Sequence, residues 1–272
     1  MRPAAFWWSC LALAAASLPG GFLWGSEALP RQAPKYTPSS LVNAASFQPG
    51  PVAPNSIVSL YGEGLAYVTR SLQPSDIRND RMPDVLPTTG VRVLIAGVSA
   101  QIYYVSPRQV NLLVPPTLVA GSAELQLVLN GLAGPAISIR VADASPALFQ
   151  QNEDTVIATR VDGTLLTRQK PGRPGDVLIL YATGLGQVFP LPTYGEIVRK
   201  AAPLVDQRRF RLFLNGTPVG QDDILYVGLS PGYPGLYQIN LRTPLATQEW
   251  PVIRLAFDET FSLDGLALPL TP

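Results

Sequence analysis

Two stretches of this chain decide its fold because they repeat each other: residues 56–65 read SIVSLYGEGL, and residues 176–185 read DVLILYATGL. Further matches at nearly the same offset are Gln109–Asn111 with Gln238–Asn240, Pro115 with Pro244, and Val93 and Gly97 with Leu212 and Gly216. Matches in several separate blocks at a near-constant offset indicate a duplicated unit. We therefore expect two homologous domains, at residues 41–150 and 151–272.

The segments in and around these repeats have the composition of β-strands. They are short, rich in Val, Ile, Leu and aromatic residues, and often alternate apolar with polar side chains. These segments are 56–61, 91–95, 100–105, 110–114, 123–129, 137–141, 176–181, 210–214 and 252–257. Asn130-Gly131 and Asn215-Gly216 provide the positive-φ residues of tight hairpins. The fold class predicted is all-β, with two tandem immunoglobulin-like β-sandwich domains after an N-terminal signal peptide, and Leu148-Phe149 filling the junction between them.

The composition excludes many kinds of catalytic and metal site. The chain of 272 residues has no His and one Cys, so it lacks a catalytic His, a His-ligated metal and a disulfide. Its net charge is +1, with acidic and basic residues nearly equal in number in each half, which argues against a nucleic-acid partner. Adjacent acidic residues such as Asp222-Asp223 and Asp258-Glu259 point to opposite sides of a strand and make poor catalytic pairs. We predict a protein that is not an enzyme and has no cofactor.

The N-terminus has the pattern of a secretory signal peptide. Arg2 precedes an apolar stretch, Pro19-Gly20-Gly21 interrupts it, and Ser26-Glu27-Ala28 supplies small residues for cleavage. The alternative is an uncleaved membrane anchor, since residues 4–24 carry no charge. We expect a signal peptide at 1–28, a Pro-rich linker at 29–40, and no membrane span after cleavage. The expected location is secreted, extracellular or in the cell envelope.

The chain also resembles a known bacterial family. Its halves are similar to IPT/TIG immunoglobulin-like domains, and together they resemble an uncharacterised tandem C-terminal module of large secreted acidobacterial proteins of the Solibacter type. The resemblance covers about residues 41–270 and rests on segments 42–46, 53–62, 105–111, 145–149, 174–176, 181–186 and 235–240. It implies a secreted β module without an established activity.

Paired amides are the most distinctive polar feature of both halves. Gln109 and Asn111 alternate with apolar residues and so share one face of a strand, and Gln238 and Asn240 repeat the pattern. One interpretation is that they bind a polar ligand such as a glycan, with Tyr233 stacking on a sugar ring. The other is that the amides satisfy neighbouring polar groups of the fold and that Tyr233 packs over the end of the sandwich.

A basic cluster at Arg208, Arg209 and Arg211 also allows two interpretations. It protects an edge strand by its outward charge, or it contacts an anionic surface or polysaccharide. For the whole protein, the leading hypothesis is a non-catalytic interaction or adhesion module for an unknown extracellular protein or glycan. The alternatives are a lectin-like or carboxylate-dependent carbohydrate-active protein, and a structural spacer whose domains form a rigid contact.

Overall fold

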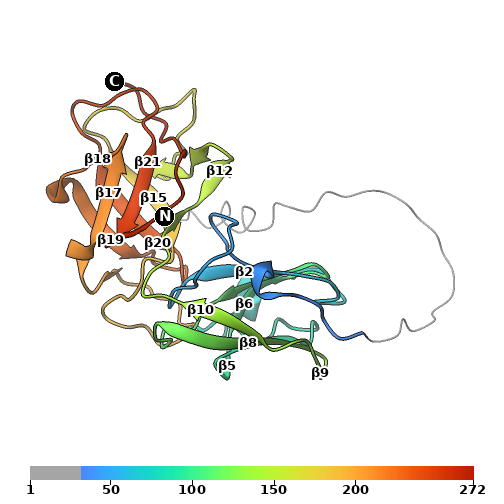
Figure 1. The fold of residues 1–272 in the computed structure, drawn as a ribbon. Helices are drawn as coiled ribbons and strands as arrows, with labels where there is room; N and C mark the ends of the chain where they lie inside the picture. The colour runs from blue at the N-terminus through green and yellow to red at the C-terminus, as the bar shows by residue number, and fades with distance from the viewer. Residues whose placement is uncertain (1–31) are drawn as a thin grey trace.

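The computed structural model describes residues 32–272 and confirms two tandem β-sandwiches (Figure 1). The predicted signal peptide lies outside the described residues. In the first domain, one sheet has the strand order β1-β2-β7-β6-β3 and the other β10-β8-β4-β5, with β9 pairing β8. The strands are β1 (Leu41–Asn43), β2 (Ile57–Tyr61), β3 (Arg70–Ser71), β4 (Val91–Ile95), β5 (Val98–Ser99), β6 (Gln101–Val105), β7 (Gln109–Leu113), β8 (Gly121–Leu129), β9 (Leu132–Ala133) and β10 (Ile137–Val141).

The second domain repeats this arrangement. One sheet has the order β11-β15-β20-β19-β16, with β14 pairing β15, and the other β18-β17-β21-β22, while β12 and β13 form a separate hairpin. The strands are β11 (Ala147–Leu148), β12 (Gln150–Asn152), β13 (Thr155–Val156), β14 (Ala158–Arg160), β15 (Val177–Thr183), β16 (Ala202–Pro203), β17 (Phe210–Leu214), β18 (Thr217–Pro218), β19 (Ile224–Leu229), β20 (Tyr237–Arg242), β21 (Ile253–Phe257) and β22 (Thr260–Phe261). The shared order of the first sheets confirms the duplication predicted from the sequence.

Details of the backbone are duplicated too. β6 has an irregular register against β7 between Ile102 and Tyr104, and β19 has one against β20 between Ile224 and Tyr226. In the hairpins, Asn130 and Asn215 have φ of 48°, as expected for the first residue of a tight Asn-Gly turn.

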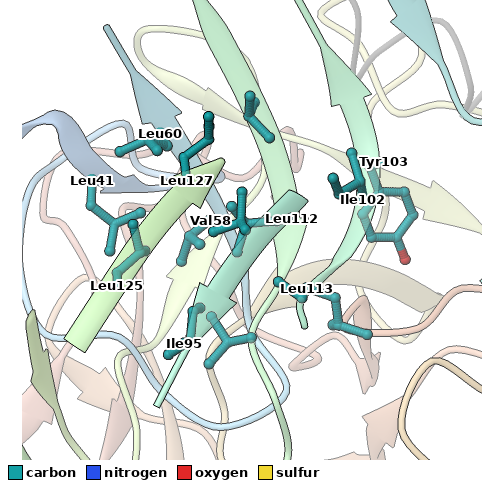
Figure 2. Packing of buried hydrophobic residues seen from close by; sticks show 14 of the residues in the cluster. Leu41, Val58, Leu60, Ile95, Ile102, Tyr103, Leu112, Leu113, Leu125 and Leu127 are labelled. Atoms are coloured by element: carbon teal, nitrogen blue, oxygen red, sulfur yellow. The ribbon is translucent and has the colours of Figure 1, made fainter. Parts of the chain in front are cut away.

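Each sandwich has its own hydrophobic core, built from the inward side of alternating strands. In β4, Val91, Val93 and Ile95 are fully buried while Arg92 is exposed. Figure 2 shows how leucine, isoleucine and valine side chains from both sheets of the first domain meet in this core. Burial of one such side chain contributes about 1.5–3 kcal/mol. Leu148 enters the second core and Phe149 packs against the first, as predicted for the junction.

Part of the segment expected to be a linker lies against the first sandwich. Tyr36 is buried, and its hydroxyl oxygen accepts a hydrogen bond of 2.6 Å from the Leu127 N–H in β8. Lys35 and Glu63 exchange two backbone hydrogen bonds of 2.9 Å. The structure therefore adds Lys35 and Tyr36 to the first domain.

Candidate ligand-binding surface

The two domains are joined by long loops at different places in the duplicated unit. β2 ends at Tyr61 and β3 begins at Arg70, whereas the equivalent β15 ends at Thr183 and β16 begins only at Ala202. Conversely, the chain from β3 to β4 is long, and that from β16 to β17 is short. The long loop of the first domain contacts the long loop of the second domain. We call the contacting segments, residues 78–82 and residues 190–199, the interdomain clasp.

Tyr194 is the central residue of the interdomain clasp. Its hydroxyl donates to the Leu113 carbonyl oxygen at 2.8 Å and accepts from the Gln101 N–H at 3.1 Å, and its side chain packs against the first core. Arg81 Nη2 donates to the Tyr194 carbonyl oxygen at 3.0 Å. A single side chain of the second domain therefore bonds to two strands of the first.

Backbone bonds extend the clasp. The Met82 N–H donates to the Gly195 carbonyl oxygen at 2.9 Å, and the Ile197 N–H donates to the Asp80 carbonyl oxygen at 2.7 Å. The Asp80 carboxylate also pairs with the Arg199 guanidinium. Backbone pairing of this kind fixes orientation more firmly than an exposed ion pair does, because the ion pair is screened by water.

A second contact between the domains lies beside the clasp. The Ile57 N–H donates to Thr183 Oγ1 at 2.9 Å, and that hydroxyl donates to the Gly235 carbonyl oxygen at 2.9 Å. A Cβ on Gly235 would lie 2.5 Å from Leu113 Cδ1, so only glycine permits this approach. Tyr103 donates its hydroxyl hydrogen to the Pro234 carbonyl oxygen. Together with the clasp, these bonds hold the two sandwiches as one unit.

Buried tyrosines make this unit sensitive to alkali. Burial is the main cause that raises the pKa of Tyr103, Tyr194 and Tyr237 above the ordinary value near 10. Since the folded state keeps these protons where the unfolded chain loses them, stability is complete below pH 10 and falls as the pH rises further. We expect each tyrosine to add a slope of about 1.4 kcal/mol per pH unit above pH 10.

Urea unfolding between pH 8 and pH 11 measures this dependence. Replacement of Tyr194 by Phe is expected to remove one tyrosine's share of the slope. A free energy of unfolding that stays constant up to pH 11 would contradict the assignment of these tyrosines as buried and protonated.

As predicted from the sequence, the two amides of each pair share one face of their strand, opposite the apolar residues of the core. In the first domain, Gln109 Nε2 donates to Asn111 Oδ1 at 2.8 Å, and Ser59 Oγ donates to the same oxygen at 2.9 Å. Asn111 is buried, with 2% of its surface exposed. In this domain the pair forms hydrogen bonds that support the fold.

The second domain keeps the same bond on a more open surface. Gln238 Nε2 donates to Asn240 Oδ1 at 2.9 Å, and Ser230 Oγ donates to Gln238 Oε1 at 3.2 Å. Ile179 stands at the register position that Ser59 occupies in the first domain. Asn240 is half-buried, and its Nδ2 donates to none of the residues that the structure describes.

Tyrosines flank the amide pair of the second domain on both neighbouring strands. Tyr181 in β15 is opposite Gln238, and Tyr226 in β19 is opposite Asn240. Tyr226 also supports the sheet edge, because its hydroxyl donates to the Leu229 carbonyl oxygen at 2.8 Å. We call Tyr181, Tyr226, Gln238 and Asn240 the tyrosine–amide face.

Tyr233 lies where this face meets the first domain. Tyr233 is half-buried. Burial is the main cause that raises the pKa of Tyr103 and of Tyr181, and the nearby Tyr233 raises both pKa values further. The structure therefore brings Tyr233, Gln238 and Asn240 into one region of the second domain, and places Gln109 and Asn111 on the corresponding sheet of the first domain.

The charged candidates from the sequence have other surroundings. β17, which carries Arg211, is not an edge strand as one interpretation of the basic cluster required, because it pairs with both β18 and β21. Arg209 forms a 2.6 Å ion pair with Asp258, and this arginine lowers the pKa of that carboxyl. A general acid needs the opposite shift of its pKa.

Among residues 32–272, no acidic cluster is placed to hold a metal ion, and no helix is long and apolar enough to cross a membrane.

No family model and no curated protein matches this chain. Among solved structures, the extracellular region of plexin A4 is 12% identical, with a TM-score of 0.29, and the alignment covers 94% of this chain and 20% of plexin. The SGBP-B protein of the Bacteroides ovatus mixed-linkage glucan utilization locus, in complex with a heptasaccharide, is 12% identical over 90% of this chain and 44% of its own, with a TM-score of 0.31. The tandem Ig repeats of Dlar are 12% identical over 88% of this chain and 95% of their own, with a TM-score of 0.21. The chain thus spans less than half the length of plexin A4 or SGBP-B.

Proposed function

We propose that this protein is a non-catalytic extracellular interaction module whose second domain binds a neutral glycan on the tyrosine–amide face. The observation that carries the proposal is the half-exposed row of uncharged polar and aromatic side chains, in which Asn240 Nδ2 donates to no described residue. Location outside the cell follows from the predicted signal peptide. In this proposal the first domain is the rigid support of the second.

The chemistry of the face suits a sugar better than an ion. An amide both donates and accepts hydrogen bonds, as sugar hydroxyl groups do, and a tyrosine ring offers an apolar surface beside a polar hydroxyl. The nearest charge along β20 is Arg242, and its Nη1 lies 3.5 Å from the Asp223 carboxylate. An anionic ligand would therefore find no free cation along this strand.

Three carboxylates of this chain are unsuited to act as the acid of a glycosidase. Glycoside hydrolysis uses two converging carboxyl groups, one with a raised pKa. Asp80, Asp162 and Asp258 instead have lowered pKa values, through an arginine at Asp80 and Asp258 and through hydrogen bonds from Thr164 at Asp162. These groups stay ionised and cannot act as the acid.

A glycan array probed with the purified protein tests the proposal. We expect selective binding to neutral oligosaccharides, with at least a tenfold loss of affinity in Asn240→Ala and a smaller loss in Tyr233→Ala, since about 1.4 kcal/mol of lost interaction is a factor of ten. The control is Gln109→Ala, which removes the half-buried member of the first domain's amide pair and should leave affinity unchanged.

Two results would overturn this proposal. Binding that Gln109→Ala weakens as much as Asn240→Ala would place the site elsewhere. An array without binding would favour the second candidate function, a rigid spacer, which the interdomain clasp supports because it fixes the domains without any ligand.

A further inference from the structure

The outer face of the second sheet of the second domain combines phenylalanine with arginine. The guanidinium of Arg254 lies 4.7 Å from the ring centroid of Phe261, and that of Arg211 lies 5.8 Å from the centroid of Phe213. The two rings are 5.9 Å apart and tilted by 43°. We call Arg211, Phe213, Arg254 and Phe261 the Arg–Phe face.

The fold does not require this face. In the register of the first domain, Leu94 stands where Phe213 stands, and Gln126 stands where Arg254 stands. On β9 the place of Phe261 is taken by Ala133. Arg92 stands where Arg211 stands, so one guanidinium is common to both domains. The two rings and Arg254 belong to the second domain alone, and the first sandwich is stable without them.

Acidic residues surround the same face. Glu259, in the turn between β21 and β22, is 94% exposed and lies 4.0 Å from Arg211, and Asp264 is 70% exposed and lies 3.7 Å from Arg254. These ion pairs are long and open to water, so each contributes little within one molecule. The face therefore carries exposed positive and negative groups, which can form salt bridges with another molecule, beside two partly exposed phenylalanine rings.

We propose that the Arg–Phe face binds a second copy of this chain. The two arginines and two carboxylates make the face complementary to itself, which is the requirement for a two-fold symmetric interface. In this arrangement the two-fold axis lies in the plane of the face and runs perpendicular to the strands. Glu259, which follows the end of β21, then lies opposite Arg254 of the second copy. Phe261 contacts the aromatic rings of that copy. Arginine and aromatic residues are enriched at such interfaces.

A polyanionic partner fits this face poorly. Each arginine already has a carboxylate within 4.0 Å, and this carboxylate would repel a polyanion. The face has four side chains, few beside the roughly 20–30 residues that each partner contributes to a standard interface, so we expect a reversible dimer. This inference goes beyond the proposed glycan site, which lies on the other sheet. A dimer would double the number of such sites and raise avidity for a repetitive surface.

Analytical ultracentrifugation of the purified protein over a wide concentration range tests the dimer. We expect reversible dimerisation, at least tenfold weaker in Phe261→Ser and in Glu259→Lys. The double variant Glu259→Lys with Arg254→Glu should recover most of the affinity, because the two charges are exchanged across the interface. Ala133→Ser, at the first-domain position equivalent to Phe261, is the matched control.

Circular dichroism and thermal melting of each variant serve as the control that it is folded. A monomer at every concentration would overturn the proposal, and so would a dimer that Phe261→Ser and Glu259→Lys leave unchanged. Neither result decides the glycan proposal, because the loss of array binding in Asn240→Ala is expected for the monomer and the dimer alike.

Discussion

Replacing Gly184 by alanine is expected to destabilise the protein more than any other single change considered for this chain. Gly184 has a φ of 76°, and a Cβ there would overlap the Ser145 carbonyl group. Ser145 cannot move freely, because its N–H donates to the Gly184 carbonyl oxygen at 2.8 Å and its carbonyl oxygen accepts from Asn43 at 3.1 Å. We expect a loss of about 2–4 kcal/mol, from left-handed strain together with the backbone overlap.

The duplication provides a matched control for this prediction. Gly64 occupies the equivalent position of the first domain with a φ of 63°, but a Cβ there would have no atom within 4 Å. Gly64→Ala should therefore cost only the strain of the left-handed conformation, about 1–2 kcal/mol. Urea unfolding of both variants measures the difference, and equal losses would show that the Ser145 contact has no role.

Replacing Tyr194 by alanine is expected to release the two sandwiches from each other. The change removes both hydrogen bonds of the hydroxyl and the packing of the ring against the first core. Each core remains complete, so both domains should stay folded. Small-angle scattering should show a larger radius of gyration, and protease should cut residues 190–199 faster.

Tyr67→Ala is the control for this variant, because Tyr67 is also a tyrosine but is 51% exposed. It should leave both the scattering and the cleavage rate unchanged. A Tyr194→Ala protein with the scattering curve of the wild type would mean that the contact between Thr183, Ile57 and Gly235 suffices to hold the domains together.

Most of the longer strands were predicted from the sequence, because several of them bury only one side. Alternation in segments such as 91–95 and 210–214 identifies the inward side without knowledge of the partners. The interdomain clasp could not be predicted in this way. Its two long loops fall at different points of the duplicated unit, so their lengths nearly cancel in the offset between repeats. The matches on either side of them, 56–65 with 176–185 and Val93 with Leu212, therefore showed no sign of an insertion.

The candidate surface was predicted in part. Strand alternation predicted that Gln238 and Asn240 share one face of a strand. It could not show that Tyr181 and Tyr226 flank them, because that depends on the register of neighbouring strands. The Arg–Phe face was missed for the same reason. Phe261 belongs to a strand of two residues, and only its pairing with β21 brings it beside Arg254 and Phe213.

The measurement that tests the central claim most directly is the distance between the domains in solution. Spin labels on Ser138→Cys in β10 and Thr217→Cys in β18, both exposed, report that distance once Cys10, the only native cysteine, is replaced by serine. Double electron–electron resonance should give one narrow distance distribution, which broadens when Tyr194→Ala is added. A broad distribution in the protein with Tyr194 intact would contradict the account of two sandwiches clasped into one rigid unit.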